Sequence, residues 1–344
     1  MYIRRYFKFT SVIQFTYTHI IWLTLWATIA FLIYTKLGLQ WLSIPWLPVS
    51  LIGIAVAFFV GFKSNSAYDR LWEARKIWGG IVNDSRSFCI AVKYYLTDQF
   101  SNKYDDEELN NLKKKLIHRH IAWIYTLRDQ LLISTPWEHV NASKYISRVN
   151  ISRREKFGLG LFKSDSIEVV HEKNISESEI GRLSKVSNKA THILDFQAEN
   201  IQNLRKDEVI EDFRHIDLQQ ILYRFYDHQG KCERIKNYPF PRQYASMSFI
   251  FVGIFIALLP FGMMPEFAKL GDSKVWLSIP FTVLVGWVFI MMELVGDYSE
   301  NPFEGLGNDI PMLSLCRTIE IDLREMMGEE DIPEKIKPIN HTVM

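Results

Sequence analysis

The sequence predicts an all-α membrane protein in which two transmembrane hairpins flank a large cytosolic helical region. Three observations carry this prediction: four long apolar runs, short links that join the runs in pairs, and basic residues that gather on one side of each pair. The mean hydropathy of −0.03 resembles that of a soluble protein because a long charged middle dilutes the apolar runs. A net charge of +1 gives no argument for a nucleic-acid partner.

The first hairpin is predicted within residues 1–64, with spans over about residues 18–36 and 41–62. No small-residue cleavage site follows Tyr34, and a second apolar run comes at once, so a cleaved signal peptide is rejected. The second hairpin is predicted within residues 243–297, with spans over about residues 244–264 and 275–292.

Basic residues set the predicted orientation. They cluster before the first span, after the second and before the third, whereas the two hairpin links carry only Lys36, Lys269 and Lys274. The positive-inside rule then places both termini and the region of residues 65–242 in the cytoplasm. We therefore expect a multi-pass protein of the cell (inner) membrane with a further cytosolic segment over residues 298–344.

The cytosolic region is expected to be helical because apolar residues recur there at spacings of three and four. The predicted helices are Leu71 to Leu96, Leu112 to Leu131, Ser184 to Leu204 and Val209 to Tyr238. For the last two of these, Ser184 and Asp207 are the predicted N-caps.

Two other features of this region, a polar segment and the cysteines, are expected to have no specific chemical role. Residues 141–178 are rich in Ser, Asn, Lys and Glu and are interpreted as a polar loop or insertion. The three cysteines are far apart and lack a C-x-x-C spacing, so reduced buried thiols are favoured over a disulfide or a metal site; they are Cys89, Cys232 and Cys316.

The second span carries two neighbouring stripes of residues four apart. Small residues, which let membrane helices approach closely, form one stripe. Bulky apolar residues form the other, and they either pack against neighbouring helices or line a shared axis as stacked apolar rings. The small stripe is Gly53, Ala57 and Gly61, and the bulky stripe is Ile54, Phe58 and Phe62.

Three motifs then resemble the bestrophin family in its bacterial form. Residues 61–79 read GFKSNSAYDRLWEARKIWG, against the family's G-F-R-x-N-x-A-Y-x-R-W-W-E-A-R-K-x-W-G; Leu71 departs from this pattern, which should alter packing and not function. Residues 300–320 resemble the family's ending E-x-P-F, N-D-L-P and L-C-x-x-I-E, and residues 230–235 resemble the lead into the third span. The matching positions of the first motif are Asn65, Tyr68, Asp69, Arg70, Trp72, Glu73, Arg75 and Trp78.

The resemblance implies a homopentameric channel in a lipid bilayer, with its pore on the five-fold axis. The family's apolar neck corresponds to Ile54, Phe58 and Phe62, and its second, cytosolic aperture falls on Ile216. No cofactor is implied.

Eukaryotic relatives hold calcium in a clasp after the fourth span. Asn301 and Asp309 occupy two of its positions here, but Leu306 stands where an acidic ligand is needed. Calcium prefers six to eight oxygen ligands, so we expect no calcium gating.

The resemblance leaves the sign of the permeant ion open, since family members favour either anions or sodium. Phenyl edges carry partial positive charge, so rings at Phe58 and Phe62 favour chloride, and bacterial relatives often have an aliphatic residue at the middle position. Acidic residues at the cytosolic mouth would instead concentrate cations; these are Asp69, Glu73 and Asp217. Anions are narrowly preferred, and a sodium-type channel is the alternative.

Other function classes have weaker support. His118 and His120 are an isolated pair without further metal ligands, and no nucleophile elbow, phosphate loop or dinucleotide fingerprint is present, so an enzyme is not expected. A secondary transporter would place ionisable groups at mid-membrane, and the second to fourth spans have none. A membrane-anchored sensor remains a third class.

Overall fold

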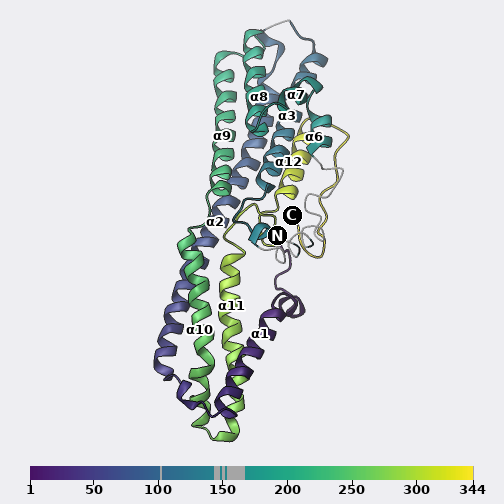
Figure 1. Ribbon diagram of the computed structural model, residues 1–344. Coiled ribbons are helices and arrows are strands. Elements are labelled where there is room, and N and C mark those ends of the chain that lie inside the picture. Colours follow the sequence, from purple (N-terminus) through teal and green to yellow (C-terminus); the bar gives the residue numbers. More distant parts are fainter. Residues whose placement is uncertain (101–102, 143–147, 149–151, 153–166, 344) are drawn as a thin grey trace. The chain divides into compact units, whose positions relative to one another are not determined.

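The computed structural model describes residues 1–100, 103–142, 148, 152 and 167–343 of the chain (Figure 1). In these residues the regular structure is helical, with only isolated bridges from Thr342 to Tyr2 and Ile339. The all-α class predicted from the sequence is therefore confirmed. The helices are α1 (Phe9–Thr35), η1 (Gln40–Leu42), α2 (Trp46–Tyr95), η2 (Asp98–Phe100), α3 (Asp106–Leu132), α4 (His139–Ala142), α6 (Ile167–Asn174), α7 (Glu177–Leu183), α8 (Lys189–Lys206), α9 (Asp212–Asn237), α10 (Arg242–Ala268), η4 (Asp272–Leu277), α11 (Ser278–Asp297) and α12 (Met312–Met326).

The chain divides into two compact units. The membrane unit comprises Arg4–Arg70 and Pro239–Asn301, and the body unit comprises Met1–Ile3, Leu71–Tyr238 and Pro302–Met344. The predicted borders follow residues 64, 242 and 297, whereas the two units divide after residues 3, 70, 238 and 301. Helix α2 is shared, because its first part belongs to the membrane unit and its second part to the body unit.

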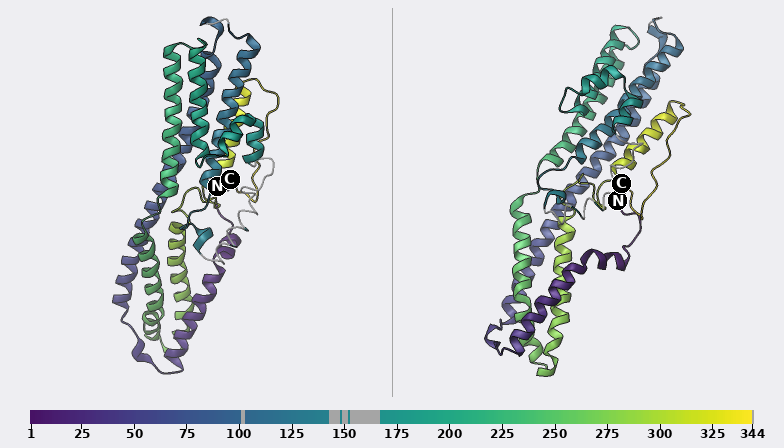
Figure 2. Two further views of the ribbon diagram at one scale, coloured as in Figure 1. Left: turned by 45° about the horizontal axis from the view of Figure 1, so that its top comes forward. Right: turned by 45° about the vertical axis from the view of Figure 1, so that its right-hand side comes forward.

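Among the described residues, four helical segments are long and apolar enough to cross a membrane, as predicted. Each overlaps one predicted span, although α1 begins at Phe9, well before the expected start near residue 18. In Figures 1 and 2 the helices of the membrane unit run side by side. The segments are Phe9–Thr35, Gln40–Tyr95, Arg242–Ala268 and Asp272–Asp297.

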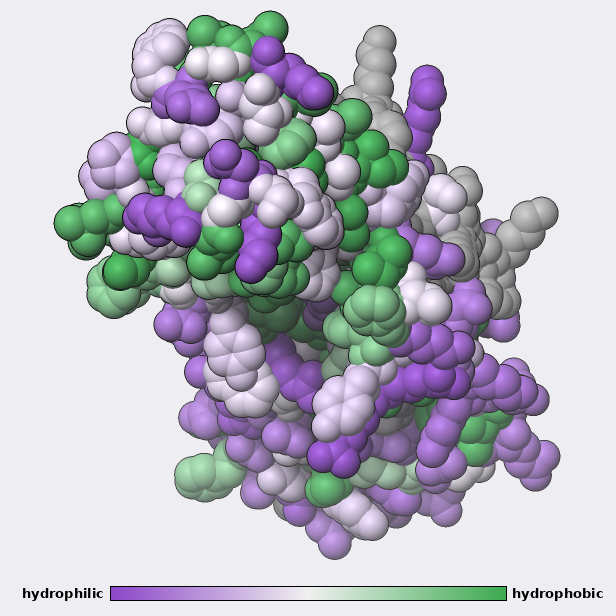
Figure 3. Space-filling model, turned by 90° about the horizontal axis from the view of Figure 1, so that it is seen from below, coloured by the Kyte–Doolittle hydropathy of each residue, from purple (hydrophilic) through white to green (hydrophobic). Residues whose placement is uncertain are grey.

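The core of the membrane unit is narrow and apolar. Its buried residues include Val56 and Val60 of α2 and Phe255 of α10. Glycines permit the closest helix contacts: a Cβ on Gly286 of α11 would lie 2.9 Å from Leu23 of α1. Many large hydrophobic side chains stay exposed, as lipid-facing helices require. Figure 3, a view from below, shows hydrophobic side chains interspersed with hydrophilic ones on the surface seen there.

The core of the body unit is larger and is centred on α3. Rings pack closely there: Phe225 lies 4.5 Å from His120 and 5.0 Å from Trp123, measured between ring centroids. Burial lowers the pKa of His120 to about 3, and its Nε2 lies 2.8 Å from the Ser85 hydroxyl. The Trp123 indole N–H donates to Gln229 Oε1 at 3.1 Å.

Buried ion pairs cross this body core. The Arg119 guanidinium lies 2.6 Å from Glu179 and also donates to Gln197 at 2.8 Å. Lys236 donates to Glu138, and both side chains are at most 5% exposed. The two ends of the described chain also meet in this unit, because the Ile3 amide donates to the His341 carbonyl at 2.9 Å.

The predicted loop over residues 141–178 is wrong in its last part, and residues 143–147, 149–151 and 153–166 lie outside the described residues. Helix α6 occupies Ile167–Asn174, and α7 begins at Glu177. Polar residues of α6 find buried partners distant in sequence: His171 lies 2.8 Å from the Thr126 hydroxyl, and Asn174 accepts from Arg324 at 3.2 Å. An eight-residue helix with such partners carries no apolar period that a sequence pattern can detect.

The predicted N-caps are also wrong. Ser184 is the C-cap of α7, and Asp207 is the C-cap of α8. The side chain of Asn188 instead caps α8 by accepting from the Thr191 amide at 3.1 Å. The Asp207 carboxylate accepts hydrogen bonds from Lys103 at 2.5 Å and from Tyr104 at 2.7 Å. These two tertiary partners bind the side chain that was predicted to cap the start of a helix.

Candidate functional site

One face of α2 in the membrane unit is apolar and exposed. Ile54, Phe58 and Phe62 have exposed fractions of 68%, 69% and 54% in the single chain, whereas Val56 and Val60 on the other face are buried. Spacings of four keep the three exposed side chains in one row along the helix. The structure therefore brings these three predicted residues together on a surface that packs against no other part of the described chain closely enough to bury them.

The two rings of this row contact each other edge to face. The Phe58 and Phe62 centroids lie 4.5 Å apart, and the ring planes meet at 82°. A ring in this arrangement turns its weakly positive edge toward the face of its neighbour. Within one chain, Phe58 and Phe62 thus form a continuous aromatic surface.

The neighbouring small-residue stripe is divided in its role. A Cβ on Gly53 would lie 2.8 Å from Cε2 of Phe255, so this glycine allows α10 to approach α2. A Cβ on Gly61 would meet nothing within 4 Å, and Ala57 is half-buried. Within the described chain, Gly53 therefore forms a close helix contact and Gly61 does not.

In the body unit, Ile216 lies in an exposed apolar row on α9. Its exposed fraction is 52%, and Phe213 and Tyr223 are exposed on the same helix. The start of α9 is anchored to the end of α2: Asp217 accepts from the Tyr95 hydroxyl at 2.8 Å, and Arg214 donates to the Tyr95 carbonyl at 3.0 Å. The hydrogen bond to Asp217, with burial, raises the pKa of the Tyr95 hydroxyl.

The first sequence motif contributes to both units. Trp78 is fully buried in the body core, and Leu71 packs against that core. Arg75 donates to the Met1 sulfur at 3.3 Å. Arg70 is half-buried, and the exposed members are Asn65, Tyr68, Asp69, Trp72 and Arg75.

Two of the three acidic residues expected at the cytosolic mouth are engaged. Glu73 lies 2.6 Å from the Arg234 guanidinium, and Asp217 is bonded to Tyr95. Asp69 is exposed. The negative potential that would concentrate cations is therefore weakened at Glu73.

The candidate calcium positions belong to different units, Asn301 to the membrane unit and Asp309 to the body unit. The Asp309 carboxylate accepts from the amides of Phe303, Gly305 and Ile310, at 3.1, 2.8 and 2.7 Å. Burial raises the pKa of Asp309, and these three N–H groups oppose the rise. Asp309 thus stabilises the loop to which it belongs through these three hydrogen bonds. The side chain of Leu306 is buried.

A buried charge cluster in the membrane unit is absent from the sequence predictions. Lys63 on α2 lies 2.5 Å from Glu293 on α11, and the Ser248 hydroxyl on α10 donates to the same carboxylate. All three side chains are buried. A lysine and a glutamate just beyond two predicted spans are the only signal in the sequence, and nothing there indicates that they pair.

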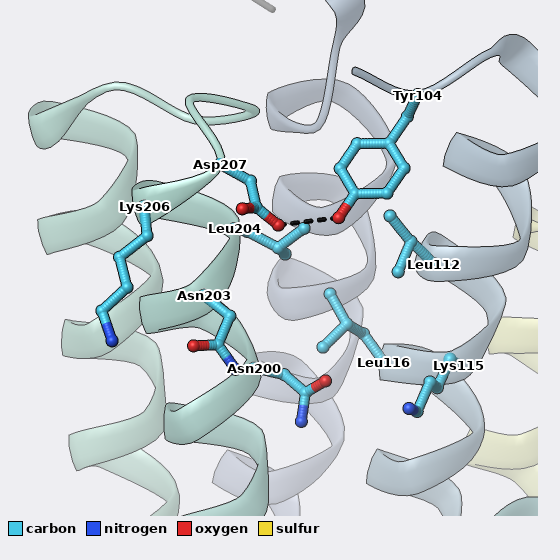
Figure 4. A pocket seen from close by; sticks show the side chains of 9 residues that line it. All are labelled: Tyr104, Leu112, Lys115, Leu116, Asn200, Asn203, Leu204, Lys206 and Asp207. Carbon is cyan, nitrogen blue, oxygen red and sulfur yellow. Dashed lines mark hydrogen bonds between the residues drawn. The ribbon is translucent and has the colours of Figure 1, made fainter.

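A pocket of about 330 Å³ in the body unit lies between α3 and α8 (Figure 4). Tyr104 and Asp207 meet across it, and Lys206 extends away from them. The remaining lining residues are Leu112, Lys115, Leu116, Asn200, Asn203 and Leu204. It contains none of the predicted site residues.

Known proteins match this chain over most of its length. The family model described as "Bacterial/Fungal Bestrophin protein" matches residues 4–325. A voltage-dependent anion channel-forming protein of Escherichia coli (strain K12) is 28% identical over 309 residues, which cover 90% of this chain and 84% of that protein. A similarly named protein of Ralstonia nicotianae is 28% identical over 84% of this chain and 79% of its own.

A bacterial bestrophin homologue from Klebsiella pneumoniae, whose crystal structure is known, has the same fold. Its TM-score is 0.71 at 21% sequence identity, over 90% of this chain and 98% of that chain. The fold, the motifs and the family match point to one conclusion. The chain belongs to the bacterial and fungal bestrophin family.

Proposed function

We propose that the chain assembles as a homopentamer in the cell membrane, with both termini in the cytoplasm, and conducts small anions such as chloride. The observation that carries this proposal is the exposed row of Ile54, Phe58 and Phe62 on a membrane-spanning helix. In a ring of subunits, three stacked apolar rings would form a narrow neck, a device that can gate a pore by dewetting. Relatives that are named as voltage-dependent anion channel-forming proteins support the proposal.

Two features favour anions over cations, and one favours cations. Phe58 and Phe62 place two aromatic rings in the row, and the ring edges that do not face a neighbouring ring would attract a permeating anion. Glu73 is paired with Arg234, which reduces the field that would attract cations. The exposed carboxylate of Asp69 favours the sodium-type alternative.

In the body unit, Ile216 is proposed as the second aperture, since its side chain is exposed on α9.

The neck is tested with Phe62→Ala and a matched Phe249→Ala control, because Phe249 is 73% exposed on α10 outside the row. In planar bilayers with asymmetric NaCl, the wild-type reversal potential should take the sign of the chloride equilibrium potential. Phe62→Ala should raise the unitary conductance severalfold, and Phe249→Ala should leave it unchanged. A reversal potential on the sodium side would instead establish the cation-selective alternative.

Single-channel steps in the same recordings separate a channel from a transporter or a membrane-anchored sensor, neither of which gives unitary currents. Native mass spectrometry should give a pentamer, and a monomer or dimer would contradict the assembly.

We also propose that calcium does not gate the channel, because the Asp309 carboxylate accepts from three amides and the Leu306 side chain has no oxygen. Micromolar calcium binding in calorimetry would refute this.

A further inference from the structure

Lys63 is the residue after Phe62 on α2, and the two side chains have opposite surroundings. Phe62 is 54% exposed, whereas Lys63 is 1% exposed. Consecutive residues of a helix are rotated by about 100° around its axis. Any rotation of α2 therefore moves both side chains together, and a group that holds Lys63 also sets the direction of Phe62.

The group that holds Lys63 is a carboxylate shared by three helices. The Lys63 ammonium lies 2.5 Å from Glu293 Oε1, and Asp297, one turn further along α11, lies at 3.9 Å. The second oxygen of Glu293 accepts from the hydroxyl of Ser248, which is fully buried on α10. Both oxygens of Glu293 are therefore used, and α2, α10 and α11 meet at one point.

Packing beside this point leaves little room for movement. A Cβ on Gly296 of α11 would lie 3.1 Å from the hydroxyl oxygen of Ser64, the residue after Lys63. A Cβ this close is tighter than most real contacts, so a larger residue at position 296 would have to displace the Ser64 hydroxyl or move the helices apart. A buried charge is costly unless it is paired, so the ion pair selects the one rotation of α2 in which Lys63 reaches Glu293.

We propose that Lys63 and Glu293 are positioning residues that fix the rotation of α2 and thereby the placement of the Phe62 ring. A role in stability alone is the other explanation. The two differ in one consequence: if only stability matters, replacing both charges by apolar residues of similar length removes the unpaired charge and restores everything. If the pair sets the rotation, the double replacement restores folding but releases Phe62. The functional part of this inference rests on the proposed function, since it takes Phe62 as a pore residue.

The test uses the full-length protein with 4-fluorophenylalanine at position 62, purified and placed in nanodiscs. The variants are Lys63→Met, Lys63→Arg, Glu293→Gln and the double variant Lys63→Met/Glu293→Met. The ¹⁹F spectrum reports the surroundings of the Phe62 ring whether or not the protein conducts. Unitary conductance is recorded in parallel on the unlabelled proteins.

We expect the ¹⁹F resonance to shift or broaden in Lys63→Met, in Glu293→Gln and in the double variant, and to stay near the wild-type position in Lys63→Arg, which keeps the charge. Unitary conductance should change by a factor of about two or more in the same variants. If the single variants fail to fold, the double variant decides alone, because it contains no unpaired buried charge.

A double variant with a wild-type ¹⁹F spectrum would overturn the positioning role, whatever its conductance. A displaced resonance with unchanged conductance would uphold the positioning role and refute the neck assigned to Phe62 under the proposed function. The two conclusions therefore fail separately.

Discussion

The two units of this protein bury charge in different ways. In the described part of the membrane unit, Lys63 and Glu293 form an ion pair with Ser248 as its hydrogen-bonding neighbour, inside a core that is otherwise largely apolar. In the body unit, buried charges recur along α3, α7, α9 and α12, and examples are Arg119 with Glu179 and Arg324 with Glu320.

The difference follows from what surrounds each unit. Membrane helices face lipid with apolar side chains, so polarity is confined to points where helices meet. The amphipathic helices of the body unit carry charged residues at the edges of their apolar faces, and packing several such helices traps these residues in pairs. Buried charge in the described part of the membrane unit is therefore limited to Lys63, Glu293 and Glu300, whereas charge in the body unit is part of general packing.

The largest effect is expected in the body unit, from Arg119→Met. This change leaves Glu179 buried and without its guanidinium partner, which should lower the free energy of unfolding by about 3–5 kcal/mol. Thermal unfolding of the purified protein measures it. The matched control is Arg86→Met, because Arg86 pairs with Asp322 at 47% exposure and should cost less than about 1 kcal/mol. Equal losses in both variants would contradict the distinction between buried and exposed pairs.

The next effect concerns helix contact in the membrane unit. Gly53→Ala places a Cβ 2.8 Å from Phe255, whose ring is held by Phe289 at 4.4 Å between centroids. The strain should destabilise the protein by about 1–3 kcal/mol. Gly61→Ala meets nothing within 4 Å and should be neutral or slightly stabilising. Unfolding in detergent compares the two, and a neutral Gly53→Ala would refute the close contact.

Acid should destabilise the body unit through His120. Burial lowers the folded-state pKa of His120 to about 3, below the unfolded value of about 6.5. The unfolded state therefore binds a proton first, so stability is present above pH 6.5 and is lost as pH falls toward 3, amounting to about 2 kcal/mol by pH 5.

Unfolding midpoints at pH 7 and pH 5 measure this loss. His120→Gln, which cannot titrate, should show a smaller difference between the two pH values. An unchanged difference in that variant would assign the acid sensitivity to other groups.

The smallest effect on stability is expected from Arg234→Ala. Its pair with Glu73 is exposed, at 63% and 44%, so the loss should be below about 1 kcal/mol. The same variant releases the Glu73 carboxylate, and the reversal potential in asymmetric NaCl should then move toward the sodium equilibrium potential. A reversal potential that does not move would place Glu73 away from the ion path.

Features that depend on local sequence were predicted well. Apolar runs identified the four membrane helices, and helical periodicity identified α3 and the second part of α2. The row of Ile54, Phe58 and Phe62 also followed from spacing, because residues four apart must share a helix face. Its role as a pore lining stays a prediction.

Features that depend on distant partners were missed. Helix α6 has too few residues for a detectable period and is held by α3 and α12 through His171 and Asn174. Asp207 has the residue type of an N-cap but bonds Lys103 and Tyr104 instead.

The sequence by itself determined that α2 crosses the membrane and which of its faces is bulky and apolar, because hydropathy and helical period are properties of neighbouring residues. Only the tertiary structure decided that Lys63 meets Glu293, 230 residues further along the chain. No local pattern links such residues. Their pairing exists because burying either charge alone in this apolar unit would be far more costly than burying both together.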